Sequence, residues 1–180
     1  MPERYVHCDF IIDANRINAK GNLKHMNILE QWKENDVISL EMAETAQNEA
    51  RQGNTNRADK ARSYVSLRAG LNDTPLADRN TIERILFPSG IQNNSDRNDV
   101  DIIFTAGKWR WILVTDDGNS KNQPMGILGN KDKLAAIGIR VMRDDEAVEL
   151  VKQKIIDRDK RAKRIAKIDG KPLPDWVGKD

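Results

Sequence analysis

Apolar residues along the chain fall into short β-rich runs that alternate with stretches of helical spacing. Residues 5–12 form an apolar run that ends in a polar cluster, which is typical of a buried strand. In residues 23–35, apolar positions recur every three or four residues, which predicts a helix. A second strand is expected at 37–40, and a helix is expected at 42–52, where a Gly-Asn pair ends it.

The rest of the chain continues this alternation. Weaker helical patterns precede a polar stretch at 88–98 that is rich in Asn and Ser, which predicts a loop. The predicted elements in this part of the chain are helices at 58–67, 76–86, 99–108 and 131–136, strands at 111–115 and 139–142, and a long helix from 144 to about 168.

Strands that alternate with helices predict an α/β fold, a three-layer sandwich with a central parallel sheet covered on both faces. A length of 180 residues suits one domain, expected at 1–148, followed by a basic helix and a loose tail at 149–180. Charge sets that boundary: residues 149–171 hold nine Lys and Arg against four acids, although the net charge of the whole chain is only +2.

Composition excludes several classes of protein. Cys8 is the single cysteine, so an intrachain disulfide is excluded, and its apolar surroundings indicate a buried thiol. No apolar run approaches the length of a membrane span, and the first residues lack a signal-peptide pattern, so we expect a cytoplasmic protein without membrane contact. His7 and His25 are interpreted as structural or surface residues.

Acidic residues follow two of the predicted strands. Asp13 comes directly after the first strand, and Asp116 and Asp117 come after the strand at 111–115. Ligands of open parallel sheets bind beyond the carboxyl ends of the strands, and carboxylates that converge there would favour a hard divalent cation such as Mg²⁺. Taken singly, each Asp is also an ordinary residue of a strand-end turn.

Helical geometry selects further acids. Asp99 shares the apolar face of its predicted helix, whereas Asp101 lies about 200° around it. An N-cap role for Asp99 is an alternative. On the helix at 42–52, Glu49 lies on the side of the small and apolar positions, and Glu44 lies about 140° away. Solvent exposure of both glutamates stays open.

The order of these motifs resembles that of the PIN domain. PIN-like proteins are metal-dependent nucleases with a central parallel sheet, and they include the ribonuclease toxins of toxin–antitoxin pairs. The resemblance covers about residues 4–148. It rests on four segments, in order: IIDAN at 11–15, AETAQNE at 43–49, DVDIIFTA at 99–106 and LVTDD at 113–117.

The resemblance implies a site as well as a fold. Matched by position, four acids would hold one or two Mg²⁺ or Mn²⁺ ions, directly or through water: Asp13, Glu49, Asp99 and Asp117. Asn15 and Thr115 match the polar positions that accompany those acids. Glu44 stays a rival of Glu49 because Ala43 stands where the family usually has a proline.

The expected activity is hydrolysis of phosphodiester bonds by a metal-activated water, with RNA favoured over DNA as the substrate and an endoribonuclease as the type of enzyme. Asn15, Arg16, Lys20 and Thr115 are the expected nucleic-acid contacts. The basic helix at 152–171 is a second possible footprint, or a docking helix for a protein partner or a second copy of the chain.

Two other interpretations stay open. The first is a PIN-like module that binds nucleic acid or protein without catalysis. The second is another Mg²⁺-dependent phosphohydrolase. That class usually places a second Asp two residues after the first, where this chain has Asn15.

Overall fold

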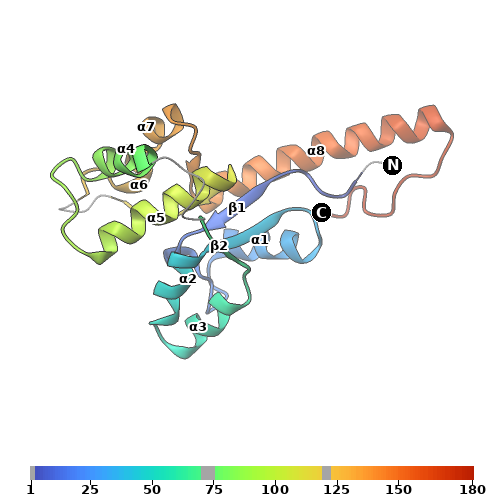
Figure 1. Cartoon of the computed structure of the whole chain (residues 1–180). Coiled ribbons are helices and arrows are strands. Elements are labelled where there is room, and N and C mark those ends of the chain that lie inside the picture. Colours follow the sequence, from blue (N-terminus) through green and yellow to red (C-terminus); the bar gives the residue numbers. More distant parts are fainter. Residues whose placement is uncertain (1–2, 70–75, 119–122) are drawn as a thin grey trace.

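The computed structural model describes residues 3–69, 76–118 and 123–180. Its centre is a five-stranded sheet in which every pairing is parallel, in the order β3-β2-β1-β4-β5. Helices flank this sheet, so the fold is α/β as predicted (Figure 1). The strands are β1 at Asp9–Ile12, β2 at Ser39–Ala43, β3 at Ser66–Leu67, β4 at Ile112–Val114 and β5 at Val141–Met142.

Helices fill the connections between the strands and extend beyond the last one. They are η1 at Ala14–Arg16, α1 at Lys24–Glu34, α2 at Glu44–Arg51, α3 at Thr55–Arg62, α4 at Leu76–Leu86, α5 at Asn94–Trp109, α6 at Gly126–Gly129, α7 at Lys131–Ala136 and α8 at Asp144–Asp169. All of β4, and β1 from Phe10 onward, is buried, as expected for central strands covered on both faces.

The chain changes direction across the sheet at β1. From β1 it proceeds through β2 to β3 on one side, and it then crosses back to β4 and β5 on the other. Because such crossovers are right-handed, the reversal places α1 and α5 on opposite faces. In keeping with this, α1 packs against α8, and α5 packs against α4 (Figure 1). The gap between β1 and β4 is therefore the switch point at which sheets of this type bind ligands.

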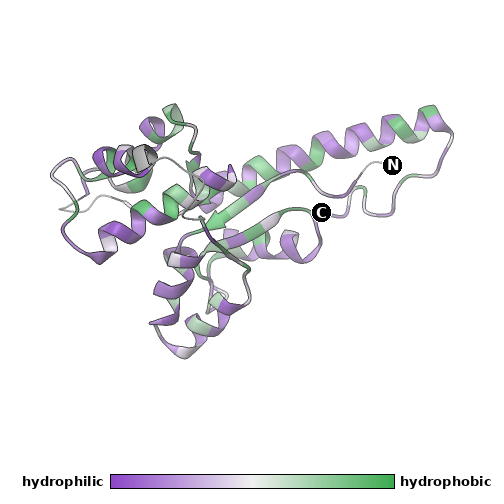
Figure 2. Ribbon diagram, in the orientation of Figure 1, coloured by the Kyte–Doolittle hydropathy of each residue, from purple (hydrophilic) through white to green (hydrophobic). Residues whose placement is uncertain are grey.

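The strands are in register at this edge. Ile12 pairs with Met42 on one side and with Val114 on the other, so three strands end at the same level. The buried core runs through the sheet and includes the first half of α8, through Val151 and Ile155. Figure 2 shows the hydrophobic colour on β1 and hydrophilic turns along most of α8, which agrees with a helix of which only one side is buried.

Several element boundaries in the first half differ from the prediction. Strand β1 begins only at Asp9, because His7 adopts a left-handed backbone conformation with φ of 54°. Strand β2 extends to Ala43, so the helix that carries Glu49 starts at Glu44 rather than at residue 42. The segment 58–67, predicted to be one helix, ends instead in the short strand β3.

Helix α5 begins five residues before the predicted start at 99. The side chain of Asn93 accepts a hydrogen bond from the backbone N–H of Asp96 at 3.0 Å and forms the N-cap. Asp99 consequently lies in the second turn, and its alternative role as an N-cap is wrong. The polar composition of 94–98 concealed the helix, because this turn packs less against the core than the rest.

The C-terminal tail is held against α8, contrary to the expected loose tail. Arg158 stacks on the ring of Trp176 at 4.4 Å and pairs with Asp180 at 3.0 Å. Asp180 also pairs with Arg4, so the tail joins α8 to the segment before β1. The domain boundary expected after residue 148 falls inside α8. None of the helices within the described ranges is both long and apolar enough to cross a membrane.

Candidate metal-binding site

Acidic residues meet at the carboxyl ends of β1 and β4, beside the switch point of the sheet. Asp13 follows β1 directly, and its backbone N–H donates to the carbonyl of Val114 at the end of β4 at 3.0 Å. This bond continues the parallel pairing by one residue and fixes the two strand ends side by side. Asp117, three residues after β4, therefore lies close to Asp13 in space although the two are far apart in sequence.

A buried hydroxyl connects these strand ends. Thr115 is fully buried, and its Oγ1 donates to Oδ2 of Asp13 at 2.8 Å. Oγ1 of Thr115 also accepts hydrogen bonds from the side-chain amide of Asn15 at 3.0 Å and from the backbone N–H of Asp117 at 3.0 Å. Asn15 also donates to Oδ2 of Asp13 at 2.8 Å. These four residues form one network, which sets the orientation of the Asp13 carboxylate.

The two neighbouring aspartates after β4 have different environments. Oδ2 of Asp117 accepts the backbone N–H of Ile127 at 2.9 Å, which turns this carboxylate toward the start of α6 and the sheet edge. Asp116 points the other way: its side chain is 59% exposed and pairs with Arg16 at 2.8 Å. The structure thus brings Asp117, and not Asp116, to the side of Asp13.

The three aspartates at the start of α5 also separate by environment. Asp96 accepts a hydrogen bond from the backbone N–H four residues before it and is buried. Asp101 forms an ion pair with Arg79. Asp99 has neither kind of partner among the described residues, and it is half-buried. Of the three, Asp99 is the carboxylate left without compensation.

Two positions on α2 show the same contrast. Glu44 pairs with Arg68, and both line a small cavity at the ends of β2 and β3. Glu49 has no ion pair among the described residues and is half-buried. Its negative charge acts on both Asp13 and Asp99. The helical-face argument for Glu49 over Glu44 therefore agrees with the environments of the two side chains.

Burial and mutual repulsion perturb these carboxylates. Burial, and after it the negative charges of neighbouring acids such as Asp13 and Asp117, together raise the pKa of Asp99 to about 8. Burial also raises the pKa of Asp13 to about 6, although the hydrogen bond from Thr115 opposes the rise. Burial raises the pKa of Asp117, against the hydrogen bond from the backbone of Ile127.

Asp13 and Asp99, whose pKa values the charges of Glu49 and Asp117 help to raise, form with those two acids an anionic group of side chains that offers only oxygen donors. Within the described ranges, no three Asp, Glu, His or Cys side chains form a ready-made ligand cluster. Mg²⁺ and Mn²⁺ prefer carboxylate oxygen, and Mg²⁺ usually keeps several waters while binding one or two carboxylates. The donor chemistry and the uncompensated charge fit such an ion, held in part through water.

The expected nucleic-acid contacts lie in different environments. Thr115 and Asn15 belong to the network that orients Asp13. Arg16 is buried and forms ion pairs with Asp116 and, at 3.4 Å, with Asp144. It therefore joins the segment after β4 to the start of α8. Lys20 alone of the four is an exposed cation, in the turn after η1.

One cation at this edge has no signal in the local sequence pattern. Arg57 on α3 donates from Nη2 to the carbonyl of Ala14 at 2.8 Å, one residue after Asp13. Its position depends on the turn between α2 and α3, where the side chain of Asn54 caps α3 by accepting the N–H of Arg57 at 3.0 Å. The Gly-Asn pair at 53–54 indicates only a helix stop, and nothing in the local pattern indicates that the next turn returns to β1.

Comparison with known proteins provides no family name. No model of a protein family matches the chain, and no curated protein matches it.

Proposed function

We propose that this chain is a metal-dependent nuclease with a PIN-like fold, and that its substrate is RNA. The observation that carries the proposal is the electrostatic influence among four carboxylates near the switch point: the charges of Glu49 and Asp117 act on both Asp13 and Asp99, and none of the four acids has an ion pair among the described residues. A fold that gathered these charges for stability alone would pair them, as it pairs Asp101 with Arg79.

The residues have separate tasks in this proposal. Asp13, Glu49, Asp99 and Asp117 hold one or two Mg²⁺ or Mn²⁺ ions, directly or through water. When bound, such an ion lowers the pKa of a coordinated water and stabilises charge on the phosphoryl oxygens. Thr115 and Asn15 act as positioning residues, because their hydrogen bonds keep the Asp13 carboxylate turned toward the other acids.

No protein nucleophile is required for this chemistry. The two histidines and the cysteine of the chain lie away from the acids: His7 lines a cavity beside α8, Cys8 is buried in the core, and His25 lies in the first turn of α1. Water as the nucleophile also makes the 2′-hydroxyl chemically dispensable, so the preference for RNA is a separate part of the proposal with its own test.

The test is incubation with labelled single-stranded RNA and with DNA of the same sequence, in the presence of Mn²⁺. We expect internal cleavage of the RNA by the wild-type chain and none by Asp13→Asn or Asp99→Asn. Asp101→Asn is the matched control. Asp101 lies on the same helix as Asp99, but its carboxylate is already paired with Arg79. Cleavage that survives both site substitutions would refute the proposed site, and cleavage of DNA alone would refute the substrate.

A non-catalytic PIN-like module is distinguished by metal binding. Mn²⁺ that binds only the folded chain raises its melting temperature by mass action. We expect this rise for the wild type and its loss in Asp99→Asn. A wild-type chain whose melting temperature does not respond to Mn²⁺ would contradict a working metal site. Hydrolysis of a small phosphoester without cleavage of polynucleotide would instead favour the phosphohydrolase interpretation.

A further inference from the structure

The second half of α8 contains a segment in which every charged residue is a cation. Residues 160–168 read KRAKRIAKI, with five Lys or Arg and no acid. Four of these cations follow the spacing of neighbours on one helix face, and all four are exposed. At about 100° per residue they occupy a sector roughly 100° wide. We call these four residues the basic stripe: Lys160, Lys163, Arg164 and Lys167.

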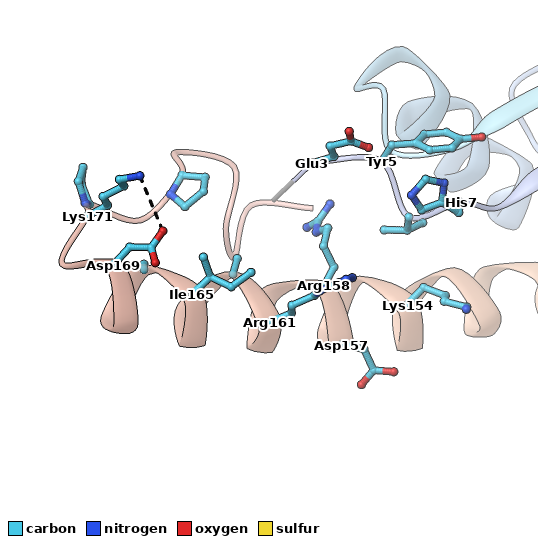
Figure 3. Close-up of a pocket in the computed structure, with 15 residues that line it drawn as sticks. Glu3, Tyr5, His7, Lys154, Asp157, Arg158, Arg161, Ile165, Asp169 and Lys171 are labelled. Carbon is cyan, nitrogen blue, oxygen red and sulfur yellow. Dashed lines mark ion pairs between the residues drawn. The ribbon is translucent and has the colours of Figure 1, made fainter. Parts of the chain in front are cut away.

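The basic stripe faces away from the rest of the molecule. Val151, Ile155 and Ala162 are buried and mark the opposite side of α8. A cavity of about 730 Å³ lies between α8, the segment before β1 and the C-terminal tail, and none of the four stripe residues lines it. Figure 3 shows Arg158 directed into this space from α8. The stripe is therefore neither a lining of that cavity nor a contact of the core.

Several other cations of α8 and of the tail have partners, whereas Lys154, Arg161 and the four stripe residues have no ion pair among the described residues. Lys152 pairs with Glu149 at 2.7 Å, and Lys171 pairs with Asp169 at 3.7 Å. Arg158 pairs with Asp159 at 2.7 Å. For the side chains of the stripe, the part of the chain that the structure describes offers no ion pair and no hydrogen bond.

Like charges at this spacing destabilise a helix. Within the stripe, Lys160 and Arg164, and likewise Lys163 and Lys167, are four residues apart, and two further pairs are three residues apart. Among the described residues, no ion pair or hydrogen bond to a stripe side chain offsets this repulsion. A polyanion laid along the outer face would offset it, because it would bring several negative charges to one row of cations.

We propose that the basic stripe binds the phosphate backbone of a nucleic acid, at a surface separate from the acidic site. The choice of nucleic acid as the polyanion rests on the proposed nuclease function. At 1.5 Å per residue, the stripe lies about 24 to 35 Å along α8 from Asp144, which adjoins the acidic edge through Arg16. Contacts to phosphates at this distance position a nucleic acid without distinguishing its sequence.

The surface is unlike that of a membrane-binding helix. Such helices insert an apolar face beside their basic face, but the buried apolar residues of α8, such as Val151 and Ile155, pack in the core. Among the described residues in the half of α8 that carries the stripe, Ile168 is the one large apolar residue that is exposed. An anionic membrane is therefore a weaker match than a phosphate backbone, which needs only exposed cations.

The test measures how salt affects binding of the full chain to a labelled single-stranded RNA of mixed sequence, by fluorescence anisotropy in EDTA. The stripe variant is Lys163→Gln with Lys167→Gln. The matched control is Lys152→Gln with Lys171→Gln, which removes the same charge from cations that already have partners. EDTA prevents cleavage and keeps divalent ions from the acidic site, so the result does not depend on that site.

Each phosphate contact contributes about 0.7 to the slope of log K against log salt concentration for a single strand. We expect the stripe variant to lower the magnitude of that slope by about 1.4 and to weaken binding equally for unrelated sequences. The control variant should keep the wild-type slope. Replacing all four stripe residues by Gln should lower the slope by about 2.8.

Equal slopes for the stripe variant and the control variant would overturn the proposal. The proposal would also be overturned if the stripe variant kept wild-type RNA binding but lost binding to vesicles of phosphatidylcholine and phosphatidylserine. The partner of the stripe would then be a membrane. Far-ultraviolet circular dichroism of each variant excludes loss of helix as the cause. If RNA binds through the stripe but is never cleaved with Mn²⁺, the nuclease function fails while this inference stands.

Discussion

Removing the charge of Asp99 should stabilise the metal-free chain. Asp99 lies on α5 without a cationic partner among the described residues, and four other carboxylates act on it. In Asp99→Asn the shape of the side chain is nearly kept, but the repulsion and the cost of burying a charge are removed. The substitution therefore separates stability from the proposed function, since it should stabilise the fold and abolish the site.

The magnitude follows from the pKa of Asp99, which rises to about 8 in the fold. An unfolded Asp has a pKa near 3.9, and each unit of difference corresponds to about 1.36 kcal/mol. The full shift sets a ceiling of about 6 kcal/mol at alkaline pH. Counter-ions and rotation of the half-buried carboxylate toward water reduce this, so we expect a gain of about 1–3 kcal/mol near pH 8.

The sign of the pH dependence follows from the same shift. Between the unfolded pKa near 4 and the folded pKa of about 8, the folded chain binds a proton that the unfolded chain releases. The contribution of Asp99 to stability therefore falls as pH rises through this window. Wild type should lose stability relative to Asp99→Asn between about pH 5 and about pH 8.

The assay is urea denaturation in EDTA at these two pH values, for wild type, Asp99→Asn and Asp101→Asn. The Asp101 variant loses a carboxylate that lies on the same helix and is paired with Arg79, so this substitution should not increase the free energy of unfolding. If Asp99→Asn is no more stable than wild type near pH 8, or if both chains respond alike to pH, the four carboxylates do not repel one another as inferred.

Three further outcomes test the network and the choice of acids. Thr115→Val should cost about 2–3 kcal/mol of unfolding free energy in urea denaturation, because a fully buried hydroxyl with three hydrogen bonds is lost; a neutral result would show that the network is dispensable. Gly126→Ala should cost about 1–3 kcal/mol and reduce the rise in melting temperature with Mn²⁺, since Gly126 has φ of 62° and an added Cβ would lie 1.8 Å from the carbonyl oxygen of Gly118; an unchanged response would remove this turn from the site. In a cleavage assay with Mn²⁺, Glu49→Gln should lower the rate by about 100-fold or more, whereas Glu44→Gln should stay within about threefold; the reverse order would exchange the two residues.

Part of the candidate site was accessible from sequence because local geometry determines it. The position of Asp13 directly after an apolar run places it at a strand end, and the 3.6-residue period separates Asp99 from Asp101 and Glu49 from Glu44. These choices need only the direction of each side chain relative to its own element. The environments of the side chains agree with them.

Other features depend on contacts between distant segments. The preference for Asp117 over Asp116 came from a family resemblance, whereas its physical basis is the turn that carries the N–H of Ile127 to Asp117 and the burial of Arg16 beside Asp116. A sequence pattern contains neither contact. Arg16 has the composition of a phosphate ligand, and the fold uses it as a buried connection between β4 and α8.

The sequence by itself determined the alternation of strands and helices, the acids at the strand ends and the basic character of α8, because each is a property of residues close together along the chain. Only the tertiary structure decided the short strand β3 and the attachment of the tail through Asp180. These depend on pairing and burial between segments far apart, whose free energies exceed the weak local preferences of polar residues. The same distinction holds for the site: the sequence provides its carboxylates, and the order of the strands brings them together.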